Sequence, residues 1–411
     1  MFRRLWAGDL LARLGYQVCE FGFPLMAVVV LHSSGFQAGL VTAAQFLPVV
    51  LVSLTAGVIA DRADTRRLML AASAVRGAAL AVLGLVYATW GLSIWVLAAA
   101  SLVVGAATVF YDVGFQSTIP RLLRPAELTR GNGLLQAGTS ATQLAGPTLA
   151  GVLLQAAGLP LVVSVTTALF AGAVLAFWLL RTASLGTGDE PGRVRHSMLT
   201  GLRFTWGCRP IRDLCVQSGL FNLHEQAFIT AFLLFGVRVA QLSAGEVGAL
   251  LGVASIGALA GSVVSGRLAG WLHAGATVTA GLLTASASFL AGPLLMLALP
   301  AVPLAAALVF GAGFAVNGVA MGAYNVYVIS LRQAIPPREF VGSATASYRM
   351  VCYGLNPVGA LAGGTLADLM GPRDALLVVA ASMTLVALTL LRSPVKRIRR
   401  VEEAHAAGTP S

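Results

Sequence analysis

The chain is built almost entirely from apolar runs that are each long enough to cross a lipid bilayer. A spanning helix needs about 20 consecutive apolar residues. Read between breaks of charge, proline and glycine, the sequence holds twelve such runs, with limits 6–31, 38–60, 68–90, 93–117, 128–155, 158–180, 212–236, 245–265, 273–299, 302–330, 341–367 and 373–391. The pattern predicts an all-α, polytopic membrane protein with twelve transmembrane helices.

Composition excludes the main alternative classes of protein. Only 10% of the 411 residues are charged and 57% are hydrophobic, whereas soluble domains carry roughly 25% charged residues. The single lysine, Lys396, precedes Arg397, so a Walker A loop and a nucleotide-hydrolysing transporter are excluded. The four cysteines form no C-x-x-C pair, which indicates neither a disulfide framework nor a metal site. We expect no cofactor and no metal.

The positive charge sorts to one side of the predicted membrane. Of the 27 Lys and Arg residues, all but five lie at the two ends of the chain or in the connections that follow even-numbered runs. The five exceptions are Arg13, Arg76, Arg349, Arg238 and Arg373. Because cytoplasmic loops are rich in Lys and Arg, we predict a multi-pass protein of the cell membrane with both termini in the cytoplasm. The net charge of +11 is then explained by contact with lipid and by orientation in the membrane, and it does not indicate binding of nucleic acid.

One long polar connection, 181–211, divides the runs into two groups of six. We therefore predict a six-helix bundle over 1–180, a cytoplasmic linker over 181–211, a second six-helix bundle over 212–392 and a cytoplasmic tail over 393–411. Met198, Leu202 and Trp206 recur every four residues in the linker, which favours a short helix on the inner leaflet over a plain polar linker.

The two groups of six also resemble each other. The segment L-A-G-P-T-L-A-G at 144–151 is similar to L-N-P-V-G-A-L-A-G-G at 355–364, and A-G-V-I-A-D-R at 56–62 matches S-G-R-L-A-G-W at 265–271. The two pairs of segments are separated by nearly the same stretch of sequence, which indicates a parallel repeat.

A motif follows the second run. It reads Gly57-Val-Ile-Ala-Asp61-Arg62-Ala-Asp-Thr-Arg66-Arg67 and resembles the G-x-x-x-D-R-x-x-R-R loop of the major facilitator superfamily. A glycine lets two helices approach, and an aspartate can face a helix amino terminus. The resemblance implies that Gly57, Asp61, Arg62, Arg66 and Arg67 form a cytoplasmic latch between the halves. The alternative is an ordinary basic inner loop.

The fifth run carries a second, partial match. Gly146-Pro147-Thr-Leu-Ala-Gly151 resembles the antiporter signature of that superfamily, and the match is to its twelve-span drug and siderophore exporters. Thr142 and Ala150 replace glycines of the pattern, and generic small-residue packing is the alternative reading. The arginine motif usual in the fourth span of proton-coupled drug exporters is absent, which puts the common proton-relay scheme in doubt.

Charged residues inside the runs are functional candidates, because placing each charged side chain in the membrane costs about 2.5–3.5 kcal/mol of insertion free energy. Asp9, Arg13, Gln17 and Glu20 share one helical face, as their spacing of four, four and three requires. Asp9 can pair with Arg13, while Glu20 lies near the midplane. Glu20 is therefore either a proton carrier or anchor for a cationic substrate, or the ion-pair partner of Arg13.

The seventh and eleventh runs hold the other charged candidates. Glu225 is the second candidate for protonation, or it pairs locally with His224 or an arginine. The pair His224-Glu225 does not continue as H-E-x-x-H, so a zinc peptidase is rejected. Arg349 needs a counter-charge, for which Glu20 and Glu225 are the candidates.

Polar stripes mark the first, fifth, seventh, tenth and eleventh runs. The side chains expected to line a substrate cavity are Tyr16, Gln17, Gln136, Gln143, Asn222, His224, Asn317, Tyr324, Asn325, Tyr353 and Asn356. An apolar lining is expected from Tyr16, Phe23, Met26, Phe228, Phe232, Met321 and Tyr324. Each stripe alone is equally explained by helix packing. The sixth, ninth and twelfth runs lack such residues, as the resemblance implies for peripheral helices. The third breaks this rule with Arg76, which either snorkels or pairs with Asp112.

These observations predict a secondary transporter that exports a small amphiphilic compound, such as a drug, antibiotic or siderophore, by alternating access. Protons are the expected coupling ion, membrane lipids the surroundings and a monomer the expected state. The alternative is a lysophospholipid translocase without proton coupling. An enzyme is not expected, because no nucleophile–base pair, metal cluster or phosphate loop is present in the sequence.

Overall fold

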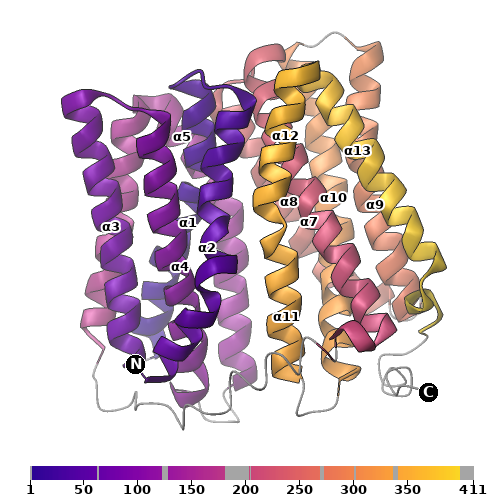
Figure 1. Ribbon diagram of the computed structural model, residues 1–411, viewed down its shortest axis with the longest axis horizontal. Coiled ribbons are helices and arrows are strands. Elements are labelled where there is room, and N and C mark those ends of the chain that lie inside the picture. The colour runs from indigo at the N-terminus through magenta and orange to yellow at the C-terminus, as the bar shows by residue number, and fades with distance from the viewer. Residues whose placement is uncertain are drawn as a thin grey trace. The chain divides into compact units, whose positions relative to one another are not determined.

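The computed structural model describes residues 2–62, 64–122, 128–180, 203, 205–268, 273–299, 302–336 and 341–398. These residues form helices and no strand (Figure 1), which confirms the predicted all-α class. The helices are α1 (Phe2–Val29), α2 (Gly35–Arg62), α3 (Thr65–Trp90), α4 (Ile94–Leu122), α5 (Leu128–Trp178), α7 (Arg209–Leu234), η3 (Phe235–Val239), α8 (Ala244–Leu268), α9 (Ala274–Ala298), α10 (Pro303–Ala334), α11 (Val341–Gly354), α12 (Asn356–Met370), α13 (Pro372–Thr389), η4 (Leu390–Arg392) and η5 (Pro394–Arg397).

Nine helices of the described chain are long and apolar enough to cross a membrane, and this count agrees with twelve spans. Helix α5 counts as two spans, because its backbone leaves helical geometry at Ala157 and Gly158 (φ +68°). The remaining two spans are α1, whose charged residues lower its hydropathy, and the pair α11 and α12, which are each too short to cross a membrane alone.

Span eleven is broken near Pro357. Helix α11 ends at Gly354, and α12 begins at Asn356 with Pro357 in its first turn. Proline lacks an N–H and crowds the carbonyl four residues earlier, so the helical hydrogen bonds do not run continuously from α11 into α12. Pro24 and Pro147, in contrast, lie inside helices that continue past them.

The chain divides into two compact units. The first comprises Met1–Pro191 together with Ser243–Gly252, and the second comprises Gly192–Leu242 and Val253–Ser411. The first turns of α8 therefore belong with α1–α5. Of the predicted linker 181–211, Met198 and Leu202 lie outside the described residues, while Trp206 is described and is 45% exposed.

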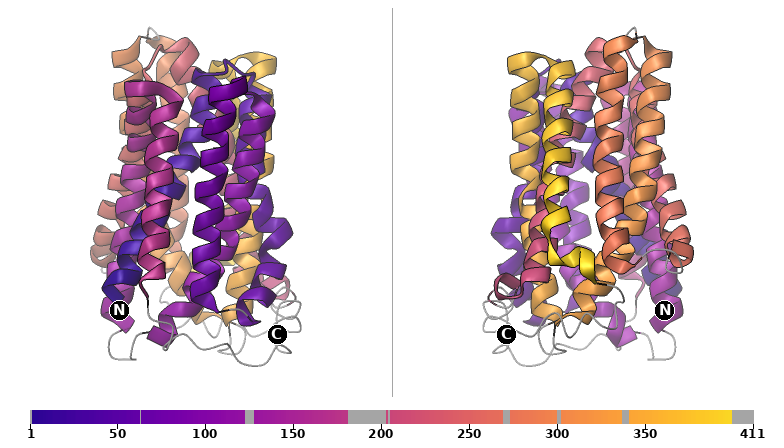
Figure 2. Two further views of the ribbon diagram at one scale, coloured as in Figure 1. Left: turned by 90° about the vertical axis from the view of Figure 1, so that its left-hand side faces the viewer. Right: turned by 90° about the vertical axis from the view of Figure 1, so that its right-hand side faces the viewer.

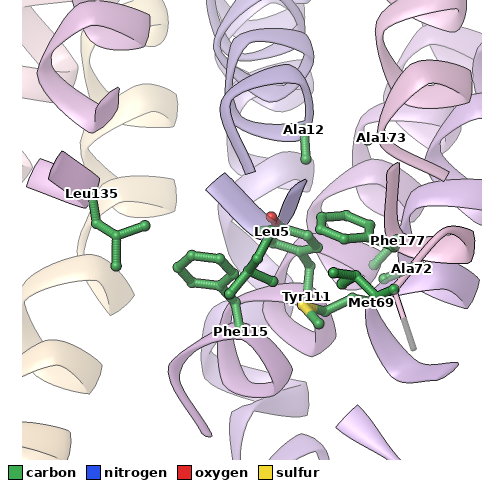
Figure 3. Close-up of a cluster of buried hydrophobic side chains, with 11 residues drawn as sticks. Leu5, Ala12, Met69, Ala72, Tyr111, Phe115, Leu135, Ala173 and Phe177 are labelled. Atoms are coloured by element: carbon green, nitrogen blue, oxygen red, sulfur yellow. The ribbon is translucent and has the colours of Figure 1, made fainter. Parts of the chain in front are cut away.

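The core of the first unit is built by α1, α3, α4 and α5. Its buried side chains include Leu5, Met69, Tyr111, Phe115 and Phe177, which meet at one level of these helices (Figure 3). Burying a large apolar side chain contributes roughly 1.5–3 kcal/mol in water; here the close contacts between helices supply the packing on which association in lipid depends.

The core of the second unit is aromatic. Phe228 stacks on Phe289 with ring centroids 4.3 Å apart, and Phe232 packs against Phe310 and Phe314 at 5.0 Å. Phe228 and Phe232 are at most 1% exposed, so the expectation that they line a cavity is wrong. Helices α9 and α13 lie side by side along one flank of this unit (Figure 2).

The two units repeat each other in backbone detail. The turn that precedes α2 has a left-handed residue, His32 (φ +47°), and the turn that precedes α8 has Gln241 (φ +56°) at the equivalent place. A capping box follows each turn: Ser34 exchanges two hydrogen bonds with Gln37, and Ser243 does the same with Glu246. Helices α2 and α8, the second spans of the two six-span halves of the sequence, therefore begin in the same way.

Helix contacts are repeated as well. A Cβ at Gly105 of α4 would overlap the Gln45 carbonyl oxygen of α2, and one at Gly318 of α10 would overlap the Ala254 oxygen of α8. In each unit the second and fourth spans thus touch backbone to backbone. The predicted parallel repeat is confirmed by these matching contacts.

Candidate functional site: polar clusters inside each unit

A buried ion pair lies on α1 in the first unit. Arg13 Nε donates hydrogen bonds to both carboxylate oxygens of Asp9, each at 2.9 Å, and Asp9 is 1% exposed. The two residues are one helical turn apart, which places their side chains on the same face. Arg13 thus pairs with Asp9, as the spacing allowed, and not with Glu20.

Aromatic rings complete this cluster. Tyr111 of α4 donates its hydroxyl to Asp9 Oδ1 at 2.9 Å, and the guanidinium of Arg13 lies 5.2 Å from the Phe115 ring centroid. The guanidinium of Arg76, from α3, lies over the rings of Tyr111 and Phe170 at 4.4 and 4.8 Å. Such cation–π contacts stabilise a desolvated cation by about 2 kcal/mol.

Arg76 therefore follows neither reading left open by the sequence. It is 1% exposed, so it does not snorkel, and no ion pair among the described side chains joins it to Asp112. It donates instead to Ser73 Oγ at 3.1 Å. Its charge is held inside the first unit by rings and a hydroxyl.

The second unit has a hydroxyl cluster at the equivalent place. Ser218 of α7 and Tyr324 of α10 share a hydrogen bond of 2.7 Å, and Tyr348 of α11 donates to Ser218 Oγ at 2.6 Å. In the repeat, Ser218 takes the position of Asp9 on the first span, and Tyr324 takes that of Tyr111 on the fourth. The first and fourth spans of both units are thus joined by a tyrosine hydroxyl, with a carboxylate as partner in one unit and a serine in the other.

The alignment that pairs Asp9 with Ser218 also pairs Arg13 with Asn222 and Tyr16 with Glu225. Asn222 Nδ2 donates to the Cys352 carbonyl at 3.2 Å. Glu225 is half-buried on α7, and among the described side chains none forms a hydrogen bond or ion pair with it. The charges of Asp9 and Arg13 are therefore paired, whereas Glu225 is a carboxylate with no cation beside it in the described part of its unit.

The remaining charged candidates are placed as follows. Glu20 is half-buried on α1 and takes part in an interaction of its own. The guanidinium of Arg349 lies 5.9 Å from the Tyr353 ring centroid. Among the described side chains of the second unit it forms no ion pair with Glu225, so that expected counter-charge is not found.

The expected cavity residues fall into three groups by their exposure. Among the buried ones, Asn317 donates to the Ala285 carbonyl at 3.4 Å and Tyr324 bonds Ser218. Asn356 is 7% exposed, and its Oδ1 has no hydrogen-bond partner among the described residues. His224, half-buried, contacts the Leu220 carbonyl through Nδ1 at 2.7 Å. Half-buried Tyr16 and Gln17 lie on α1, and the exposed group is Gln136 and Gln143 on α5, Asn325 on α10 and Tyr353 on α11.

The exposed group places polar side chains on the surfaces of the spans. An amide without a hydrogen-bond partner is costly in hydrocarbon, so Gln136, Gln143 and Asn325 are expected to face a water-filled path. The peripheral spans contrast with this pattern, since Leu85 of α3 and Leu385 of α13 are 63% and 66% exposed and apolar.

The loop motif is described in part. The side chains of Gly57, Asp61 and Arg62 lie outside the described residues. Arg66 donates to the carbonyls of Phe177 and Trp178 at 2.9 and 2.5 Å, at the carboxyl end of α5, where a helix dipole favours a cation. Arg67 lies 3.7 Å from Asp64, whose carboxylate caps α3.

The antiporter-like segment of α5 is a site of close helix approach. A Cβ at Gly151 would overlap the Ala244 carbonyl oxygen, and one at Gly248 would overlap the Pro147 oxygen. On its other side, a Cβ at Gly146 would overlap the Gln17 side chain. The small residues of this segment are thus required by contacts with α1 and with the first turns of α8, all within the first unit.

The sequence matches the family model described as transmembrane secretion effector, a family of the major facilitator superfamily, over residues 1–409. The chain belongs to this major facilitator family. The multidrug efflux pump Tap of Mycobacterium tuberculosis is 27% identical over 412 residues, which cover 94% of this chain and 92% of the relative. Tap of Mycolicibacterium fortuitum is 25% identical, over 96% and 95% of the two chains.

Solved structures agree on the major facilitator fold. The nucleoside transporter NupG has a TM-score of 0.75 at 12% identity, covering 95% of this chain and 99% of that one. A bacterial homologue of the human lysosomal transporter Spinster, in an inward-facing conformation, has a TM-score of 0.72 at 17% identity, covering 100% and 98%. With its family and its apolar helices, this major facilitator protein is a multi-pass membrane transporter.

Several residues of the clusters carry no signal in the sequence. Tyr111, Ser218 and Tyr348 are not among the predicted candidates, because a single hydroxyl in an apolar run has no local pattern. Aligning the two halves on the matching segments 56–62 and 265–271 places Ser218 at the position of Asp9, and this is the signal that could have found it. Among the described residues, no group of three His, Cys, Asp or Glu side chains is placed to hold a metal ion.

Proposed function

We propose that this transporter exports small amphiphilic compounds, such as drugs, antibiotics or siderophores, and that inward movement of protons drives the export. The relatives named multidrug efflux pumps, which align along nearly the whole chain, support the substrate class and the direction. One proton that crosses 100 mV supplies about 2.3 kcal/mol, enough for roughly a fortyfold substrate gradient.

The observation that carries proton coupling is the isolation of Glu225. The carboxylate of Asp9 is paired with the guanidinium of Arg13. A half-buried carboxylate without a nearby cation is stabilised by taking up a proton, and its charge is stabilised again when water or a cationic substrate reaches it. Glu20 is the second coupling candidate, on the corresponding first span of the other unit.

The polar side chains exposed on the spans are the proposed substrate contacts. Gln136 and Gln143 lie two helical turns apart on one face of α5, and Asn325 and Tyr353 are their exposed counterparts in the second unit. Half-buried Met321, one turn before Asn325, offers an adaptable apolar surface. Alternating access of the two units would open this path to each side in turn.

The test uses inside-out membrane vesicles that carry a proton gradient and a panel of amphiphilic substrates. We expect Glu225→Gln to lose gradient-driven uptake while it retains exchange of labelled for unlabelled substrate. Glu246→Gln is the matched control, because Glu246 is an exposed carboxylate that caps α8, and it should transport like the parent. Glu20→Gln is assayed in parallel.

Two outcomes would overturn the proposal. If Glu225→Gln and Glu20→Gln both keep full gradient-driven transport, the coupling assignment is wrong. If the parent moves labelled lysophospholipid, is insensitive to uncouplers and moves no drug of the panel, the lipid translocase is the better description.

A further inference from the structure

Two buried cysteines lie close together inside the second unit. Cys215 of α7 and Cys352 of α11 are 1% and 2% exposed, and both are reduced. Cys352 Sγ lies 4.0 Å from the Cys215 carbonyl oxygen, so the two residues face each other where α11 meets α7. We call these two residues the thiol pair. No step of the proposed transport uses either sulfur.

The thiol pair lies in a strip of contacts that holds α11 on α7. Cys215, Ser218 and Asn222 follow at intervals of three and four on α7, and Tyr348 and Cys352 are four apart on α11, so each set shares one face. Ser218 accepts from Tyr348 at 2.6 Å, and Asn222 donates to the Cys352 carbonyl at 3.2 Å. All of these contacts are hydrogen bonds or thiol contacts, which can be broken and remade.

The other half of span eleven is attached to α7 in a different way. A Cβ at Gly359 would overlap the Leu223 carbonyl oxygen, and one at Gly363 would overlap the Ala227 oxygen. Helix α12 therefore touches the α7 backbone directly, where any displacement opens a gap in the packing. Helix α11, whose last residues are joined to α12 through the break at Leu355, approaches α7 less closely. A Cβ at Gly219 would lie 3.4 Å from Val351 Cγ1 and 3.6 Å from the Val351 carbonyl oxygen, which leaves α11 more room to change its contacts.

We propose that the thiol pair is a dithiol modification site whose oxidation to a disulfide fixes α11 on α7 and stops transport. Two S–H bonds break and one S–S bond forms; the two protons and two electrons pass to a small, membrane-permeant azo or disulfide oxidant, which is reduced to a hydrazine or to two thiols. Two cysteines held this close on neighbouring helices need little displacement to reach the short Cβ–Cβ distance of a disulfide.

Formation of the bond is tested independently of transport. Membranes that contain a Cys19→Ser, Cys208→Ser variant, which retains the thiol pair, are treated with diamide and alkylated, and the protein is digested without reductant. Mass spectrometry should find the peptides of Cys215 and Cys352 joined and lighter by two hydrogens. Cys352→Ser in the same background should give no joined peptide. Absence of the joined peptide in the variant with the thiol pair at saturating diamide overturns the site.

The functional consequence rests on the proposed transport activity and is measured in a second arm. Diamide should remove most of the transport of the variant with the thiol pair, and dithiothreitol should restore it. The Cys215→Ser and Cys352→Ser versions should transport before and after treatment alike. If the joined peptide forms and transport is unchanged, α11 need not move on α7, and the proposal that the disulfide stops transport is wrong. If no preparation transports any substrate, the proposed function fails while the modification site is still decided by the peptides.

Discussion

At the scale of single residues, the first unit pairs its buried carboxylate with several donors at once. Asp9 receives two hydrogen bonds from Arg13 and one from Tyr111, which satisfies most of the carboxylate's acceptor capacity. Desolvating two charges costs several kcal/mol per ion unless geometry of this quality compensates it. The pair is therefore a structural element, and loss of one member leaves an unpaired buried charge.

Removing one member of this pair should destabilise the protein strongly. We predict that Asp9→Ala lowers the free energy of unfolding by about 1.5–3 kcal/mol, because the half-buried Arg13 then loses both of its hydrogen bonds to a carboxylate. The double variant Asp9→Ala, Arg13→Ala should lose less than the sum of the two single variants. Unfolding of purified protein in mixed micelles with rising dodecyl sulfate measures all three. Additive losses would show that the two side chains are not coupled.

The residue scale also shows where sequence reasoning ends. The Asp9–Arg13 pair was predictable, because a spacing of four on one helix fixes which side chains can meet. The position of Arg76 was not, because its rings come from Tyr111 and Phe170 on two other helices. Spacing along a helix says nothing of partners that arrive through tertiary packing.

At the scale of helices, the contact between second and fourth spans is set by glycine in both units. Gly105 and Gly318 each bring a backbone within reach of a carbonyl oxygen on the neighbouring helix. Close approach of this kind strengthens helix association where lipid offers no hydrophobic driving force. A methyl group at either position would occupy the space of an oxygen atom.

A single added methyl should therefore separate these helices. We predict that Gly105→Ala and Gly318→Ala each destabilise the protein by about 1–3 kcal/mol or more through overpacking. Gly133→Ala is the matched control: Gly133 is exposed on α5, a Cβ there meets nothing within 4 Å, and helix propensity favours alanine by about 1 kcal/mol. Melting temperatures from fluorescence-detected size exclusion rank the variants; an equal loss in all three contradicts the packing argument.

The helices themselves were largely predictable, since an apolar run of bilayer length allows few other structures. The separation of the fifth and sixth spans near residue 157 followed from the glycine at position 158. The break that divides α11 from α12 was not expected as two separate helices. A proline marks a position where a helix is weakened, but contacts with neighbouring helices decide whether the helix ends there.

At the scale of the whole molecule, charge predicts orientation and the polar linker separates two sets of six spans. The assignment of Ser243–Gly252 to the first unit could not be predicted, because it depends on glycine contacts between α5 and α8. Hydropathy counts spans and charge orients them, but neither reports which helix ends pack together.

The charge distribution makes a direct prediction for topology. Green fluorescent protein fused after Ser411 should fluoresce, since it folds in the cytoplasm, whereas alkaline phosphatase at the same position should be inactive. Both results should reverse for reporters inserted after Gly91, between α3 and α4, which lies on the opposite side of the membrane if each span crosses once. Equal activity at the two positions would contradict the twelve-span orientation.

The repeated contacts of the two units also show how one of them changed length. Gly318 lies about one helical turn further from the start of its helix, at Pro303, than Gly105 lies from the start of its own, at Ile94. Because the difference is a whole turn, Gly318 faces the neighbouring helix as Gly105 does. A difference of half a turn would have rotated it away from its oxygen. The two copies of the repeat thus differ in the length of this helix by about one full turn, which leaves the glycine on the same face of the helix.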